Sequence, residues 1–255
     1  MVGVTTVALI ERKLGISRDL FTRYWRDIHG VMAARIPGFE TYTQYHVTPT
    51  GDHEPFEGIA IVTYANEQDR QGLANSAVTP HIHRDEQNVF RRALLYNLDA
   101  AARRTSGDGD RRLGPAKFFA IPAGTDPEQV RKYIAASNPA FCDSYDLTSG
   151  DPAGWNDTDT DDGGCGRRFV AVFHAGWLAE PDSTQLAKLR VPAYRLDETH
   201  VMVDHGVPTA VGLRGLDAVR TIMEAGADNQ FADDVVHAIY GLAGGAKSSV
   251  RVAEE

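Results

Sequence analysis

The chain has 255 residues, of which 42% are hydrophobic and 24% are charged, and its formal net charge is −9. This composition is that of an ordinary globular protein, and it excludes a collagen-like fibre, a wholly disordered chain and a disulfide-rich miniprotein. The acidic balance argues against a general nucleic-acid partner, because phosphate binding needs a basic face.

Neither a membrane nor an export route is predicted from the sequence. No apolar run approaches the roughly 18 residues of a membrane-spanning helix, and the first residues do not have the pattern of a secretory signal. We therefore expect a cytoplasmic protein with no membrane partner. In that compartment the two cysteines, Cys142 and Cys165, are expected to be free thiols.

The first hundred residues predict the order βαββαβ. Ser17 is a suitable N-cap for an amphipathic helix whose apolar residues recur every 3.6 positions, and Pro37-Gly38 ends that helix. The predicted elements are a strand over 4–11, a helix over 17–36, strands over 39–48 and 58–64, a polar helix from 66, a short helix over 83–92 and a strand over 93–99.

The same order repeats in the second half of the chain. The predicted elements are strands over 117–121, 141–148, 168–177 and 194–203, with helices over 126–136 and 183–189, and then two tail helices over 216–225 and 231–242. The repeat predicts two duplicated domains, one over 1–100 and one over 116–207. A linker over 101–115 joins them, and a helical extension over 208–255 follows.

This pattern predicts an α+β fold of two tandem ferredoxin-like units. Each βαββαβ unit forms an antiparallel sheet with its helices on one face, so the other face needs a partner. Two such units in one chain can stack their bare faces and form a barrel-like pair, with a ligand cavity expected between the sheets. A monomer is then feasible, and a homodimer stays open.

Residues 4–98 resemble the EthD family of the dimeric α/β-barrel superfamily. The resemblance is carried by Phe21-x-x-Tyr24-Trp25-x-x-x-His29-Gly30, Pro37-Gly38-x-x-x-Tyr42-x-x-x-His46-Val47, Phe56-Glu57-Gly58 and Asp85-Glu86-x-x-x-Phe90. The second half shares the topology but lacks the Tyr-Trp-x-x-x-His pattern. The resemblance implies a mostly apolar cavity with His, Tyr or Trp side chains, in a superfamily that includes cyclases, dehydratases, isomerases and monooxygenases, many of which use no cofactor.

The candidate catalytic residues are His29, Tyr42 and His46. His29 follows Trp25 on the predicted helix, and histidine titrates near neutrality, which suits proton transfer. Tyr42, Gln44 and His46 share one face of the second strand. The opposite face is more apolar and is expected to meet the helices, so these three residues are expected to point into the cavity, with Trp25 and Gln44 binding substrate.

The remaining candidate substrate-binding residues are His81, His83, His174, Trp177 and His200. The first two precede acidic residues and have the side-chain types of a metal site, but they lie at a predicted helix start, where both rings do not face one side. An Asp-rich stretch over 157–162 lacks the central glycine and the final glutamate of a calcium loop. We therefore predict no metal site.

The leading hypothesis is an enzyme that acts on an aromatic or polyketide-like small molecule by cofactor-free acid/base chemistry, such as cyclisation, dehydration or isomerisation. His29 or His46 would be the base and Tyr42 the acid. The alternative is an oxygenase on a similar substrate, either cofactor-independent or using reduced flavin. A second alternative is a non-catalytic protein that binds a small molecule.

Overall fold

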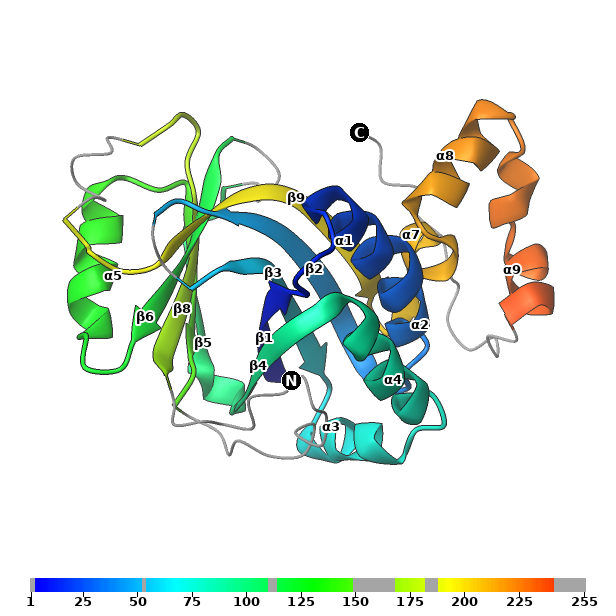
Figure 1. The fold of residues 1–255 in the computed structure, drawn as a ribbon, viewed down its shortest axis with the longest axis horizontal. Helices are drawn as coiled ribbons and strands as arrows, with labels where there is room; N and C mark the ends of the chain where they lie inside the picture. Colours follow the sequence, from blue (N-terminus) through cyan, green and yellow to red (C-terminus); the bar gives the residue numbers. More distant parts are fainter. Residues whose placement is uncertain (1–2, 52–53, 110–113, 149–167, 182–187, 241–255) are drawn as a thin grey trace.

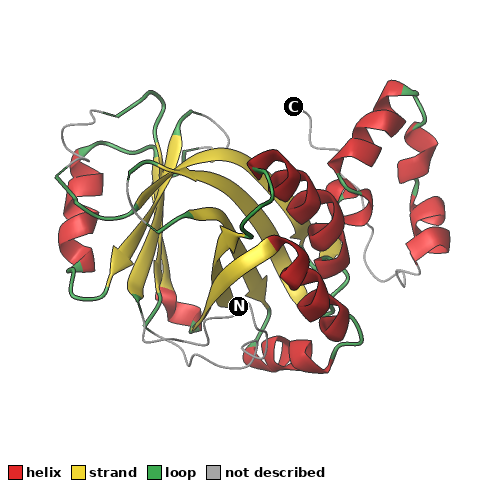
Figure 2. Cartoon of the chain, viewed as in Figure 1, coloured by secondary structure: helices red, strands yellow, loops and turns green. Residues whose placement is uncertain are grey.

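One ten-stranded antiparallel sheet forms the centre of the protein and curls into a barrel, with the helices on its outside (Figure 1, Figure 2). The computed structural model describes residues 3–51, 54–109, 114–148, 168–181 and 188–240. The strand order is β4-β1-β3-β2-β9-β6-β8-β7-β5, and β10 pairs with β9. The mixed α+β class predicted from the sequence is confirmed.

The first half has the predicted βαββαβ order. Ser17 caps the first helix and Asn66 caps the polar helix, because each side chain accepts a hydrogen bond from a backbone N–H three residues later. The short helix begins earlier than predicted, and the strand that follows it begins at Phe90. The elements are β1 (Val4–Arg12), α1 (Arg18–Tyr24), η1 (Trp25–His29), α2 (Gly30–Ala33), β2 (Phe39–Pro49), β3 (Phe56–Tyr64), α3 (Glu67–Gly72), η2 (Leu73–Asn75), α4 (Thr79–Val89) and β4 (Phe90–Leu98).

The described part of the second half has four strands in the predicted places, with a helix between the first two, and a helical extension follows it. The predicted helix residues 183–187, the Asp-rich stretch and Cys165 lie outside the described residues. In the described part of the chain, no helix is long and apolar enough to cross a membrane. The elements are β6 (Ala116–Pro122), α5 (Pro127–Ala136), β7 (Phe141–Asp146), β8 (Phe169–Gly176), β9 (Ala193–Asp204), β10 (Val207–Pro208), α7 (Ala210–Arg214), α8 (Leu216–Glu224), η4 (Asp228–Phe231) and α9 (Asp233–Tyr240).

The segment predicted as a linker, 101–115, takes part in the sheet. After β4 the chain makes one short turn of helix, η3 (Ala100–Ala102), and forms β5 (Arg103–Ser106), which pairs with β7 of the second half. At the other junction, β2 pairs with β9 over eight residue pairs. The two end strands of the sheet, β4 and β5, are therefore consecutive in the chain, and the two halves share one sheet.

The bare faces of the two halves meet inside the barrel. Phe56 and Leu9 of the first half pack in one cluster with Phe118, Val172 and Tyr194 of the second, and all five are buried. This confirms that the strands of the two halves face each other across the barrel within one chain. The expectation of a ligand cavity between the sheets is wrong, because large side chains fill that space and the cavity described below lies on the other face of the first sheet.

Tyr42, Gln44 and His46 point toward the helices, so their predicted orientation is wrong. Tyr42 packs with the helix-side core, and Gln44 and His46 contact Trp25, whereas Tyr45 and Val47 pack inside the barrel. One face of β2 is buried and most of the other is half-buried, so protein covers both, and their relative apolarity could not identify the one that meets the helices.

Candidate active site

A cavity of about 230 Å³ lies between the outer face of the first sheet and the helices that cover it. Its floor comes from β1, β2, β3 and β4, and its roof from η1, α2, α3 and α4. The centre of the floor is made of small side chains, Ala8, Ala60 and Ala93, which leave room under the helices. A concave, partly open and mostly apolar space with a few polar groups is typical of small-molecule sites.

The helix segment above this floor is a π-helix, η1, which carries Trp25 and His29. Gly30 follows directly and allows the segment to approach the sheet closely. A Cβ atom at Gly30 would lie 2.6 Å from Nε2 of Gln44 and 2.8 Å from Cε of Met202. A π-helical turn between two α-helical segments is frequent at functional sites, and here both of its inward side chains line the cavity.

His29 forms a buried pair with Asp85 of α4. Nδ1 of His29 lies 3.0 Å from Oδ2 of Asp85, and both side chains are less than 10% exposed. An ionised carboxylate only accepts hydrogen bonds, so the proton of the neutral ring sits on Nδ1. Nε2 of His29, which has no hydrogen bond to any described residue, is then the nitrogen that can accept a proton from a ligand in the cavity.

Asp85 is held ionised by its neighbours. Burial alone would raise the pKa of Asp85, but the hydrogen bonds from His29 and Tyr24 outweigh it, and the pKa lies below its ordinary value. Tyr24 donates its hydroxyl proton to Oδ1 of Asp85 at 2.6 Å, and Nδ2 of Asn88 donates to the Tyr24 oxygen at 3.1 Å. The carboxylate therefore remains a fixed acceptor that orients the imidazole.

Tyr42 lines the cavity and is positioned by Gln44. Nε2 of Gln44 donates to the Tyr42 hydroxyl at 2.8 Å and to the backbone oxygen of Trp25 at 2.9 Å. Because the Tyr42 oxygen accepts from Gln44, its own hydrogen can be donated elsewhere. Burial raises the pKa of Tyr42 above its ordinary value, so this phenol is a proton donor, not an anion, at neutral pH.

Trp25 forms one wall of the cavity. Its ring stacks on Phe21 with centroids 5.7 Å apart, and it lies directly above Gly58, where a Cβ atom would come within 2.7 Å of Cζ3. The Glu57-Gly58 dipeptide of the EthD-like pattern thus has a packing reason, because only glycine at the second position leaves room for the indole.

His46 and His200 lie behind Trp25, outside the set of residues that line the cavity. The His46 ring is 4.7 Å from the Trp25 ring and 5.2 Å from the His200 ring, and neither of its nitrogens is hydrogen bonded to a described residue. Burial lowers the pKa of His46 to about 2. Such a ring is a neutral packing group, and its distance from the cavity removes the geometric basis for a catalytic role.

The other predicted binding residues do not line this cavity. His174 faces the space between the two halves, where the sequence predicts it, stacked on Phe118 at 4.2 Å, and it does not line the cavity under the helices. Trp177 is buried in the core of the second half, where its indole donates to Ser137. His81 is exposed and His83 is half-buried on α4, and neither lines the cavity.

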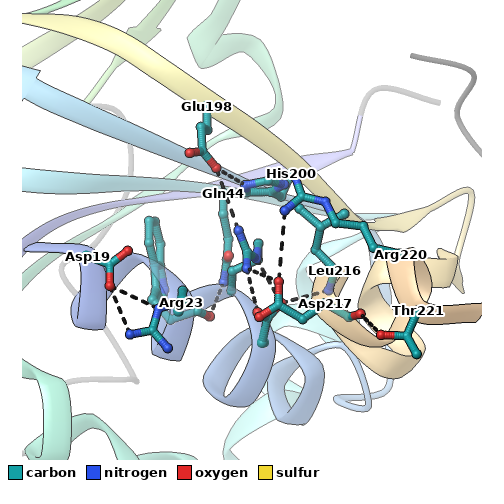
Figure 3. Close-up of polar contacts among 12 residues, drawn as sticks. Asp19, Arg23, Gln44, Glu198, His200, Leu216, Asp217, Arg220 and Thr221 are labelled. Atoms are coloured by element: carbon teal, nitrogen blue, oxygen red, sulfur yellow. Dashed lines mark hydrogen bonds and ion pairs between the residues drawn. The ribbon is translucent and has the colours of Figure 1, made fainter. Parts of the chain in front are cut away.

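The rear of η1 is fixed to the helical extension by a buried cation. The Arg26 guanidinium is 5% exposed and contacts Asp27 at 2.6 Å, Asp217 of α8 at 3.2 Å and Glu198 at 3.8 Å. Figure 3 shows Leu216 and Asp217 of α8 next to the helix, with Glu198 paired to His200 above them. The segment that carries Trp25 and His29 on one side is therefore held by α8 and β9 on the other.

Two acidic residues of α4 were not proposed as site residues from the sequence. Asp85 and Glu86 are both buried, the first beside His29 and the second in the cavity lining. Their signal was present, since Asp85-Glu86 belongs to the EthD-like pattern. Over the described part of the chain, no group of three or more His, Cys, Asp or Glu side chains is placed to hold a metal ion.

Comparison with known proteins finds a domain family that part of the first half matches. Residues 13–92 match the EthD domain, as the sequence resemblance predicts. No curated protein matches the chain. An anthrone oxidase-like protein of known structure superposes with a TM-score of 0.50 at 10% identity, over 81% of this chain and 96% of that one. At this identity the likeness shows the fold alone.

Two further structures match more loosely. A "putative monooxygenase" from Lactobacillus acidophilus NCFM has a TM-score of 0.42 at 9% identity, over 82% of this chain and 98% of that one. Another, from Fusobacterium nucleatum, has a TM-score of 0.45 at 8% identity, over 81% and 97%.

Proposed function

We propose that this protein is an enzyme that removes a proton from a hydroxy- or keto-substituted aromatic small molecule held in the cavity of the first half. The observation that carries this proposal is that His29, paired with Asp85, lies in the lining of a mostly apolar cavity. A carboxylate that fixes the imidazole tautomer, with the second nitrogen free to accept a proton, is the arrangement of a general base.

In this reaction, Nε2 of His29 takes a proton from a phenol or from a carbon next to a carbonyl. The negative charge moves onto the substrate oxygen, where the Tyr42 hydroxyl donates a hydrogen bond. Returning the proton from His29 to a different atom isomerises the substrate, and returning it to a departing hydroxyl group releases water and dehydrates the substrate. Neither course requires a cofactor, and both agree with the leading hypothesis from the sequence.

A second candidate is oxidation of the same anion by dioxygen, and the fold neighbour described as anthrone oxidase-like favours it. In this reaction a CH₂ group loses a proton to His29, and the carbanion adds O₂ and is protonated to a hydroperoxide. Loss of water then leaves a ketone. Oxygen takes up the two electron pairs that the substrate loses, so O₂ consumption equals substrate consumption.

Anthrone is a suitable probe, because its CH₂ group lies next to an aromatic ketone system. Deuterium incorporation at that carbon is measured by mass spectrometry after incubation in D₂O without oxygen. Because no oxidation can then occur, this measures proton removal alone. We expect His29→Ala to lower the enzymatic rate about 10²–10⁴-fold, whereas His237→Ala, an exposed histidine of α9, retains it. Equal rates in the two variants would contradict the assignment of His29.

The same probe separates the two reactions. Uptake of one O₂ per anthrone, measured with an oxygen electrode, favours the oxidase, whereas exchange without O₂ uptake favours acid/base chemistry alone. Tight binding of anthrone with neither exchange nor O₂ uptake would overturn both and leave the protein as a binding protein.

A further inference from the structure

The end of the cavity away from the η1 wall is polar, and the proposed reaction does not use it. Thr6 of β1, Tyr64 of β3 and Asn97 of β4 all line the cavity at this end. The Thr6 hydroxyl donates to Oδ1 of Asn97 at 2.7 Å. Both Thr6 and Tyr64 are more than nine-tenths buried, at 7% and 2% exposure.

The strand registers place this polar group away from the catalytic pair. Thr6 is opposite Asn97, whereas Phe90, which contacts the His29 ring at 5.1 Å, is opposite Arg12 at the other end of β1. Between the two ends the floor is apolar. Trp25, which precedes His29 on η1, lies above Gly58, and Gly58 is opposite Ile10, so this wall and Thr6 are separated along β1 by at least four residues, or roughly 13 Å at 3.3 Å per residue.

We propose that Tyr64 and Thr6 form a second subsite, which binds an uncharged oxygen of the substrate, a ketone or a hydroxyl, one or two rings away from the carbon or oxygen that His29 deprotonates. This proposal rests on the proposed function and names the substrate class of the same cavity. The buried Tyr64 phenol can donate to or accept from such an oxygen, and the Thr6 hydroxyl, whose hydrogen goes to Asn97, can accept from a ligand hydroxyl. Between the two subsites the apolar floor takes the ring system itself.

The charges at this end favour a neutral oxygen over a carboxylate. The one cation in this part of the lining is Arg70, whose Nη1 donates to the backbone oxygens of Thr5 and Leu98 and whose Nη2 pairs with Glu67. Its donors and its charge are thus already matched. Glu86 also lines the cavity, so a carboxylate ligand would add a like charge to a desolvated space.

Three naphthalenes test this subsite by equilibrium dialysis, which measures affinity and not turnover. 2-Naphthol has one oxygen, 2,6-dihydroxynaphthalene has a second oxygen at the opposite end, and 6-hydroxy-2-naphthoate has a carboxylate there. We expect the diol to bind about three- to tenfold more tightly than 2-naphthol, as one additional hydrogen bond provides. We expect the carboxylate to bind no more tightly than 2-naphthol.

The variant that tests the assignment is Tyr64→Phe, which should reduce the preference for the diol to about one. Tyr96→Phe is the matched control, because Tyr96 lies on β4 but packs on the barrel side, and it should keep the preference. Thr6→Val is the second test should Tyr64→Phe fail to fold. An unchanged preference in both test variants, or a carboxylate that binds most tightly, overturns the proposal.

The result of this binding test is independent of the result of the anthrone test of the proposed function. A diol preference that depends on Tyr64 in a protein without anthrone exchange would support the subsite and reject the catalysis. Exchange that depends on His29 without a diol preference would do the opposite.

Discussion

The side chain of Asp27 and the backbone of Leu216, 189 residues later, form a hydrogen bond of 2.7 Å, with Oδ1 of Asp27 accepting from the Leu216 N–H. Leu216 is the first residue of α8, so Asp27 satisfies a backbone donor at the start of that helix while its other oxygen pairs with Arg26. One carboxylate therefore links the π-helical segment to the C-terminal extension.

Replacing this carboxylate should cost far more than replacing an exposed one on the same helix. Asp27→Ala leaves the buried Arg26 guanidinium without its best partner and removes the hydrogen bond to α8, so we expect the free energy of unfolding to fall by about 3 kcal/mol. Asp19→Ala, which breaks an exposed pair with Arg23, should cost less than about 1 kcal/mol. Urea unfolding measures both, and equal losses would contradict the linking role of Asp27.

His46 should make the protein less stable in mild acid. Its folded pKa of about 2 lies far below the ordinary value of about 6.5, so the unfolded chain binds the proton more readily. The stability that neutral His46 allows is complete above about pH 6.5 and is lost as the pH falls toward the folded value, by up to about 1.4 kcal/mol per pH unit.

The substitution His46→Leu should therefore reduce the slope of unfolding free energy against pH between about pH 6 and about pH 4. His237→Leu, on the exposed side of α9, should keep the slope of the unchanged protein. The His46 variant should also retain the proton exchange assigned to His29. Loss of exchange with an intact fold would show that the wrong histidine had been chosen.

Ionised Asp85 should stabilise the fold, and this contribution should be lost at a lower pH than that of His46. Its folded pKa lies below the ordinary value of about 3.9, so the ionised carboxylate stabilises the fold above about pH 4, and this contribution is lost as the pH falls through the folded pKa. Asp85→Asn removes it, so unfolding of the variant should depend less on pH below about 4. Asp233→Asn, exposed on α9, is the control that should follow the unchanged protein.

The fit between Gly58 and Trp25 can be tested with a single methyl group. A Cβ atom at position 58 would approach the buried indole to 2.7 Å, so Gly58→Ala should destabilise the protein by about 1–3 kcal/mol and shift the tryptophan fluorescence. At Gly72, where a Cβ atom would have no neighbouring atom within 4 Å, alanine should be neutral or slightly stabilising. A harmless Gly58→Ala would mean that the indole wall is not tightly held.

Local patterns in the sequence predicted the elements and their order. Ser17 and Asn66 are read as helix caps because capping depends on a few neighbouring residues, and the repeated βαββαβ order follows from periodicity alone. The strand β5 was missed because Arg103–Ser106 is exposed and polar, and it becomes a strand only through pairing with β7.

The site was predictable in part. His29, Tyr42 and Trp25 were identified from the EthD-like pattern, and the structure places all three in the cavity lining. The location of that cavity was not predictable from periodicity, because both faces of β2 are at least half-buried over most of the strand and a sequence does not distinguish the barrel interior from the helix side. Asp85 was missed as a partner of His29 because 56 residues separate them, and a contact of that kind depends on how α4 packs on η1.

The consecutive end strands β4 and β5 have a consequence for how this protein is assembled. In a barrel made of two separate chains, dilution dissociates the two chains, and each sheet then loses the support of the other. Here both sheets are translated as one molecule, so the barrel closes at any protein concentration. The second half of the chain then supports the first from within the same molecule, through the β2–β9 pairing and the shared barrel interior.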